Sequence, residues 1–244
     1  MIAFSISDIL TKVLKGNIEM PTIQKGFLCI SCLIIPLIFF ISCRGNNEKP
    51  KNYFIGQIEY SYNYSSDFFN IDSLKLIKPW KSEFRYDLKN YQSKFIGKDT
   101  ITYYYSGNLN KCLSMANGVL DSLCEDYGIA TDSIISFKVY DANEKILGYE
   151  CKIIEFQSKL FWNRYYVSKD LILAPAIYNR HISYNWSFYG EKTQGGLILK
   201  LEHRFKKYTM YGIASGIKPF SHEEGALQIN EKLFDDMCFG IRTW

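Results

Sequence analysis

Apolar and polar residues alternate along much of the chain after residue 52. In Tyr53–Tyr64 large apolar side chains occupy nearly every second position, with polar residues between them. A period of two places one set of side chains on one face of a strand, so the segment predicts a long β-strand with one buried face. The residues expected on that face are Phe54, Ile58, Tyr60, Tyr62 and Tyr64.

The same kind of pattern predicts further strands, several of them joined as hairpins. They are Ser82–Asp87, Thr100–Tyr105, Ile134–Tyr140, Lys145–Phe156, Phe161–Val167, Leu197–Phe205 and Tyr208–Ile217. Asp141–Glu144 carries turn-forming residues and predicts the hairpin between the third and fourth of these. Alternation in the fourth places Leu147, Tyr149 and Cys151 on its buried face. Gly148, in the middle of that strand, predicts a bend or a bulge.

Helical patterns are shorter and weaker. A short helix is predicted to begin near Pro175, because proline is tolerated in a first helical turn. Asn230–Gly240 predicts a closing helix with Asn230 as its N-cap. No interior linker or repeat interrupts the pattern, so residues 53–244 are expected to form a single domain. The predicted fold class is mainly β, a curled antiparallel sheet with one or two short helices.

A continuous apolar segment stands apart near the start of the chain. Phe27–Ile41 follows Lys25 and is followed by Ser42 and Cys43. A basic residue, a short hydrophobic core and a small residue before a cysteine predict an export signal that ends in a lipid-attachment site. The alternative, a transmembrane helix, is disfavoured because the run is shorter than the roughly 20 residues that span a bilayer and contains Pro36.

This interpretation divides the N-terminal region. Residues 1–19 are predicted to be a mis-called extension, and residues 20–42, beginning with the true initiator methionine, a lipoprotein signal peptide. Cys43 is then the acylated first residue of the mature protein, and residues 43–52 form a polar tether. We expect a lipid anchor in the outer membrane and a domain that faces the periplasm, because Arg44 rather than an aspartate follows the anchor and the tether lacks an acidic cluster.

Charge and composition narrow the function classes. The 244-residue chain has 29 basic and 25 acidic residues, and its net charge of +4 is spread without a block of one sign. A dedicated nucleic-acid binder would cluster its Lys and Arg, so no nucleic-acid partner is expected. Aromatic residues make up 16% of the chain, which suits the pleated surface of β-strands.

Seven cysteines divide between the signal and the domain. Cys29 and Cys32 leave with the signal, and Cys43 takes the lipid. The others form an even set in an oxidising compartment, which allows two disulfides in any of three pairings, or buried free thiols. No metal site is expected, because these cysteines are widely spaced and no histidine flanks them. They are Cys112, Cys124, Cys151 and Cys238.

The predicted hairpin around residue 145 carries a resemblance to a known family. Lys145–Cys151 reads Lys-Ile-Leu-Gly-Tyr-Glu-Cys, and Trp162–Leu171 reads Trp-Asn-Arg-Tyr-Tyr-Val-Ser-Lys-Asp-Leu. Both resemble the core of the GLPGLI-type exported proteins of Bacteroidetes, and Phe40–Cys43 resembles the looser lipobox of that phylum. The resemblance extends loosely over residues 53–220 and implies an open, LolA-like half-barrel, although Ala214–Pro219 does not reproduce the Gly-Leu-Pro-Gly-Leu-Ile loop. Most members of the family have no assigned function.

Four tripeptides resemble the Asp-(Ser/Thr)-aliphatic acceptor of O-glycosylation in the same phylum. Asp-Ser pairs are also common in turns and helix caps, so a purely local role stays open. The candidate acceptors are Ser73, Thr100, Ser122 and Ser133.

No catalytic motif is complete. Ser221–Gly225 resembles a zinc-protease helix, but Ala226 stands where the second histidine would be needed. His181 and His203 lie in aromatic surroundings, and the chain has no nucleophile elbow, P-loop or dinucleotide loop. We therefore expect a non-enzymatic envelope lipoprotein without a cofactor, whose apolar concavity holds a lipid or a partner protein. A surface glycan-binding lipoprotein is the alternative.

The anchor hypothesis predicts that Cys43→Ser abolishes metabolic labelling with fatty acid, because the thiol that takes the lipid is gone. The variant should accumulate as precursor or as unanchored protein. Labelling is measured in the native host, and unchanged labelling of the variant contradicts the assignment.

Overall fold

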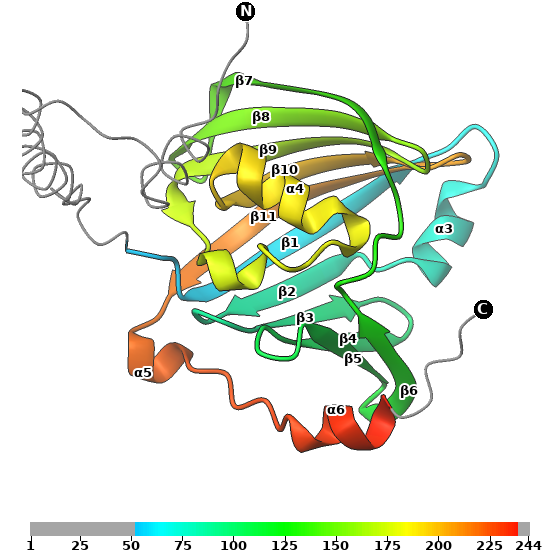
Figure 1. The fold of residues 1–244 in the computed structure, drawn as a ribbon. Coiled ribbons are helices and arrows are strands. Elements are labelled where there is room, and N and C mark those ends of the chain that lie inside the picture. Colours follow the sequence, from blue (N-terminus) through cyan, green and yellow to red (C-terminus); the bar gives the residue numbers. More distant parts are fainter. Residues whose placement is uncertain (1–51, 239–244) are drawn as a thin grey trace, which may run out of the picture. The chain divides into compact units, whose positions relative to one another are not determined.

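Figure 1 shows the computed structural model, which describes residues 52–238. In this part of the chain eleven strands form one antiparallel sheet in the order β6-β5-β4-β3-β2-β1-β11-β10-β9-β8-β7. The strands are β1 (Gly56–Ser65), β2 (Lys81–Tyr86), β3 (Tyr91–Ile96), β4 (Thr100–Ser106), β5 (Lys111–Ala116), β6 (Val119–Asp126), β7 (Ile134–Ile146), β8 (Tyr149–Ser158), β9 (Trp162–Ile172), β10 (Gly196–Arg204) and β11 (Thr209–Pro219). The sheet is curled and open, since β6 and β7 are its two edges.

Short helical segments accompany the sheet. Within residues 52–238 they are α3 (Ile71–Ile77), η1 (Pro175–Ile177), η2 (Ser183–Asn185), α4 (Trp186–Thr193), α5 (His222–Gly225) and α6 (Lys232–Met237). The predicted fold class, a mainly β protein with a curled antiparallel sheet, is confirmed. The helix expected near Pro175 is only the 3-10 turn η1. The closing helix is present as α6, with Glu231 rather than Asn230 at its N-cap position.

Among the described residues, none of the helices combines the length and the apolar character that a membrane crossing requires.

The strand β1 forms the centre of the sheet, paired with β2 on one side and β11 on the other. Its side chains alternate between buried and more exposed positions, as the sequence predicts. All five residues expected on the inner face are at most 8% exposed. Since β1 has a neighbour on both sides, its backbone groups are paired along the ladder. The ring of Tyr60 also packs edge to face on the ring of Phe84 in β2, with centroids 5.6 Å apart. The prediction for this segment is confirmed.

The predicted hairpin between β7 and β8 is real, but its turn was placed wrongly. Ile146 pairs with Tyr149, so the turn consists of Leu147 and Gly148. Their φ angles of 50° and 87° are those of a two-residue hairpin turn with both residues left-handed. Leu147 is therefore 48% exposed instead of buried. Asp141–Glu144, which resembles a turn, instead lies inside β7 where the register shifts, as in a bulge.

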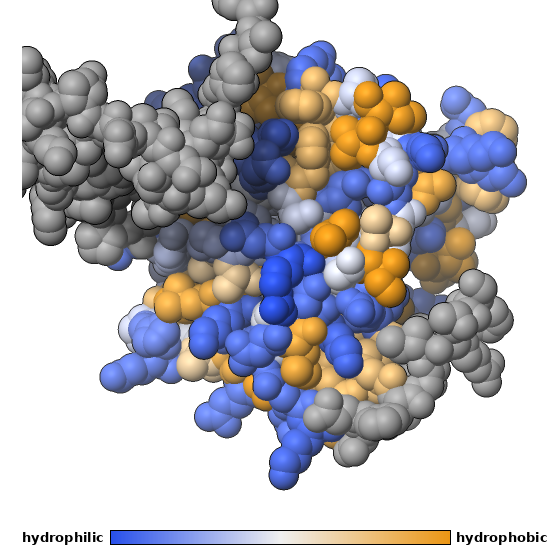
Figure 2. Space-filling view, viewed as in Figure 1, coloured by the Kyte–Doolittle hydropathy of each residue, from blue (hydrophilic) through white to orange (hydrophobic). Residues whose placement is uncertain are grey.

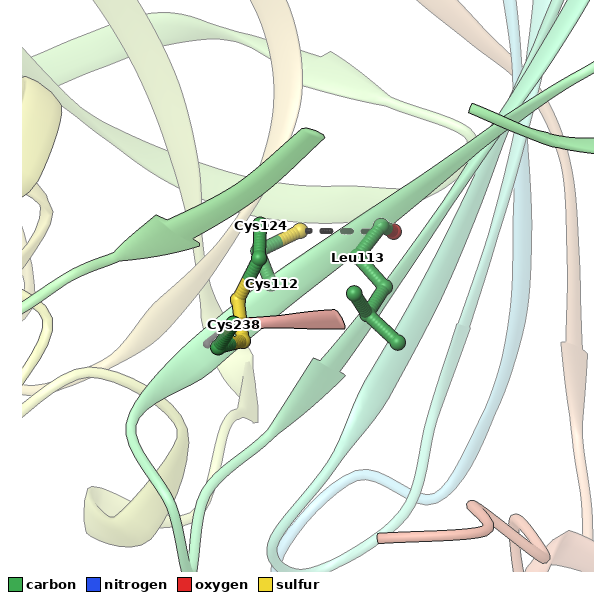
Figure 3. Close-up of a disulfide and its surroundings, with 4 residues drawn as sticks. All are labelled: Cys112, Leu113, Cys124 and Cys238. Carbon is green, nitrogen blue, oxygen red and sulfur yellow. Dashed lines mark hydrogen bonds between the residues drawn. A yellow bond between two sulfur atoms is a disulfide. The ribbon is translucent and has the colours of Figure 1, made fainter. Parts of the chain in front are cut away.

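One disulfide ties the end of the described chain to an edge strand. Cys124 of β6 is bonded to Cys238, which directly follows α6, across 114 sequence positions (Figure 3). A loop of this length is expected to contribute about 4–5 kcal/mol to stability. Cys112 and Cys151 are buried free thiols, and burial raises the pKa of the Cys112 thiol to about 12. The sequence left disulfides and buried free thiols open, and the described cysteines include both.

The turn makes a testable prediction, because leucine is strained in the left-handed region whereas asparagine adopts it readily. Leu147→Asn should raise the free energy of unfolding by about 1 kcal/mol, as measured by urea denaturation. Leu147→Ala is the matched control and should change it by less than about 1 kcal/mol, because little buried surface is lost. A loss of about 2 kcal/mol or more in the control, the range for a packed core residue, would contradict this placement.

Candidate functional site

One face of the sheet is covered by the segment between β9 and β10, residues 173–194, called here the crossing segment (Figure 1). At its ends Leu173 N donates to Gly195 O at 2.8 Å. In its middle, Ile182 N and Ser183 N both donate to Tyr127 O, at 2.7 and 3.1 Å. Tyr127 follows β6, so the crossing segment is fastened to the opposite half of the sheet from the strands that it connects.

Between the crossing segment and the sheet lies a cavity of about 400 Å³. This volume falls within the roughly 300–1,000 Å³ of small-molecule sites. The wall is mostly aromatic and comes from strands on both halves of the sheet, with Leu201 and Met210 adding aliphatic surface. The aromatic side chains on the wall include Tyr60, Tyr62, Phe84, Tyr86, Tyr91 and Trp186.

Several tyrosine hydroxyls at or next to the cavity bond to the protein itself. Tyr60 Oη donates to Ile198 O at 2.6 Å, and the Tyr62 hydroxyl lies 2.6 Å from Ser82 Oγ. Tyr105 Oη, behind the wall, donates to Asn110 Oδ1 at 2.9 Å. Burial raises the pKa of Tyr62 and of Tyr105 to about 12. These hydroxyls therefore stay protonated at neutral pH and fix the rings in place.

His181 is the most unusual residue on the wall. Its side chain is 4% exposed and stacks on Tyr127, with ring centroids 3.9 Å apart and planes inclined by 12°. Neither ring nitrogen has a hydrogen-bond partner. Burial lowers the pKa of His181 to about 3, so the imidazole is neutral near pH 7.

Other polar side chains on the wall include those of Trp186, His203 and Glu125. Trp186 Nε1 and His203 Nε2 are buried without a partner, and burial lowers the pKa of His203 to about 4. Glu125, at the end of β6, accepts a hydrogen bond from Tyr184 Oη at 3.2 Å. It is the one carboxylate among the described lining residues.

On the opposite face of the sheet, a buried polar side chain has all of its hydrogen-bond partners. Glu155 of β8 is only 5% exposed, yet it accepts from Tyr140 Oη and from Arg164 Nε, both at 2.6 Å. Lys138 Nζ lies 2.7 Å from its other oxygen. Burial acts to raise the pKa of Glu155, but the bonds from Lys138, Tyr140 and Arg164 outweigh it and lower the pKa to about 2. The buried charge here is fully paired, so this cluster is structural.

The sequence-predicted modification sites do not converge on the cavity. Ser73 is exposed on α3, Ser133 is exposed before β7, and Thr100 is half-buried at the start of β4. Ser122 lies in β6. The signal, Cys43 and the tether up to residue 51 lie outside the described residues. Whether these positions carry glycan or lipid stays a prediction.

The zinc-protease-like segment has a local role. Ser221 Oγ accepts from Glu224 N, and the Glu224 side chain accepts from Ser221 N, which is a capping box at the start of α5. Within residues 52–238 no three His, Cys, Asp or Glu side chains gather as a metal site would require.

Comparisons with known proteins add little. No protein-family model and no curated protein matches the chain. Among solved structures it is similar to PNGF-II in two space groups, with 15% and 12% sequence identity and TM-scores of 0.34 and 0.36. The matches cover 74% and 73% of this chain but 30% of the PNGF-II chain in each case. The chain thus spans less than a third of that protein.

His181 makes stability depend on pH in a defined window. Between pH 6.5 and about 3 the unfolded chain binds a proton at this position and the folded chain does not, so stability is lost as pH falls. Replacing the ring by His181→Phe should make the loss between pH 6 and pH 5 smaller by about 1 kcal/mol. Urea denaturation of both proteins at the two pH values measures this, and equal losses would contradict a neutral buried imidazole.

Proposed function

We propose that this chain is a non-enzymatic binding protein of the bacterial cell envelope that holds an apolar ligand in the cavity under the crossing segment. The observation that carries the proposal is the mostly aromatic wall around about 400 Å³ of space. Apolar walls with a few polar groups are typical of small-molecule sites. A lipid or another acyl-chain compound of the envelope fits that surface.

The polar groups of the wall favour binding over catalysis. No side chain orients His181 by a hydrogen bond, because neither of its ring nitrogens has a partner, and Nε2 of His203 has none either. Glu125 is bonded to Tyr184 rather than to a histidine. On the described wall the imidazole of His181 is thus not part of the hydrogen-bonded arrangement of nucleophile, base and orienting group that nucleophilic catalysis uses.

The burial of the aromatic rings favours a lipid over a glycan. Sugar rings stack on aromatic side chains that are presented on an open platform, whereas Tyr60, Tyr62, Tyr86 and Tyr91 are at most 8% exposed. On the face shown in Figure 2, apolar residues appear as separate patches among hydrophilic ones.

In this proposal the domain is tethered to the outer membrane through a lipid on Cys43 and faces the periplasm. The N-terminal sequence pattern supports the lipid anchor. Arg44, which follows the anchor in place of an aspartate, supports the outer membrane as its location. Such a tethered protein acts as an acceptor or a scaffold, since a soluble shuttle would need to leave the membrane. The exposure of Ser73 and Ser133 is compatible with O-glycosylation at these two positions.

Filling part of the cavity should weaken ligand binding. Leu201 lies on the wall, so the larger indole of Leu201→Trp should weaken binding of the hydrophobic dye N-phenyl-1-naphthylamine by about tenfold or more, which is about 1.4 kcal/mol. Ile213 lies on the adjacent strand β11, one register position away from the partner of Leu201, and is 45% exposed. Ile213→Trp is therefore the matched control and should leave dye affinity unchanged.

Fluorescence titration measures the dye affinity, and mass spectrometry of extracts from the natively purified protein identifies the bound compound. Equal dye affinity of the two variants, or the absence of dye binding to the wild-type protein, contradicts the proposal.

A further inference from the structure

The cavity contains a concentration of unsatisfied polar atoms. Of the seven buried side-chain polar atoms without a partner in the described part of the chain, four belong to cavity-lining residues. They are both ring nitrogens of His181, Trp186 Nε1 and His203 Nε2. Buried polar groups in proteins are nearly always hydrogen-bonded, and the described residues supply no partner for these four atoms.

His181 and Trp186 form one polar pole of the cavity. Their ring centroids are 6.1 Å apart and the planes are inclined by 57°, so one small head group can contact both side chains. Trp186 stacks on Tyr189, which fixes the indole at the start of α4. His203 lies elsewhere, on β10, where its ring stacks on Phe205 with centroids 4.1 Å apart.

The fold does not need the nitrogens of His181. The ring is held by its stack on Tyr127 and by the backbone, where His181 N donates to Tyr178 O at 3.1 Å and Ser187 N donates to His181 O at 2.7 Å. A phenyl ring could make the same stack. An imidazole at this position therefore leaves its hydrogen-bonding capacity available to whatever enters the cavity.

The donors and acceptors at this pole indicate which kind of ligand head group can bind there. A neutral imidazole provides one N–H donor and one acceptor, and the indole provides one donor. A hydroxyl or a primary amide can satisfy both kinds of group. A carboxylate only accepts and would meet the charge of Glu125 on the same wall, while a quaternary ammonium neither donates nor accepts.

We propose that the ligand is an uncharged amphiphile, such as a long-chain alcohol, an acylglycerol or a fatty amide, whose head group is bound by His181 and Trp186 while its chain lies along the tyrosine wall. This inference rests on the proposed binding function and names its ligand class.

The test uses four probes with the same ten-carbon chain and different heads: decanol, decanoate, decyltrimethylammonium and decane. Each displaces the naphthylamine dye from the full-length protein. Decanol should bind tightest, and His181→Phe should weaken decanol by about tenfold, or about 1.4 kcal/mol, without changing the affinity for decane. His203→Phe replaces the other lining histidine in the same way and should leave the preference for decanol intact.

A second readout does not depend on the folding of a variant. In the ¹⁵N-labelled wild-type protein the indole N–H resonance of Trp186 should shift on addition of decanol and much less on addition of decane. Trp186→Phe identifies that resonance.

The outcomes separate the two proposals. Equal affinity for decanol and decane, or a decanol affinity unaffected by His181→Phe, overturns the head-group inference and leaves the cavity function standing. Tightest binding of decyltrimethylammonium also overturns it, in favour of a cation site at Glu125, and tightest binding of decanoate overturns it in favour of an anion site. Failure of the wild-type protein to bind the dye overturns the binding function itself.

Discussion

The structure depends on one constraint, which is that an open, curled sheet must cover its apolar face. The crossing segment does this, and its fit is specific. The Tyr178 ring packs so closely on Gly190 and Gly195 that a β-carbon at either glycine would overlap it. Further along, Arg180 Nη2 donates to Gly107 O and Asn108 O at 2.9 and 2.8 Å. The cover is thus locked near β10 by packing and on the far half of the sheet by hydrogen bonds, and the space left between these two fastenings is the cavity.

Much of the fold could be predicted from local patterns, and the failures have physical reasons. In β1 the alternation of tyrosines with polar residues was sufficient to predict the strand and its buried face, because the strand is central and one of its faces packs in the core. Around residue 145 the residue types led to a wrong prediction of where the turn lies. Asp141–Glu144 has turn residues but bulges within a strand, whereas the actual turn carries Leu147, a residue that turns of this type seldom use. Pairing across the sheet decided the register over local preference.

Two elements that the sequence analysis did not predict carry a recognisable sequence pattern. The hairpin of β5 and β6 turns at Asn117-Gly118, both left-handed, and Asn-Gly between two strands is the strongest short-range indication of a hairpin. The helix α3 is capped by Asn70, whose Oδ1 accepts from Asp72 N at 2.8 Å. These elements were predictable in principle. An apolar concavity was expected, but the residues that line it could not be assigned, because its wall joins Tyr60, Tyr91 and His181, which are far apart in sequence and meet only through the topology.

The two faces of the sheet show that this chain can satisfy a buried polar group when stability alone is at stake. Glu155 is surrounded by three donors, and their bonds more than offset the effect of its burial. His181 is as deeply buried, and neither nitrogen of its ring has a hydrogen-bond partner. Consistent local solutions are expected throughout a fold, and departures from them concentrate at functional sites. The departure here lies on the wall of a cavity large enough to admit a ligand, so the missing partner of the imidazole is best sought in the ligand and not in the protein.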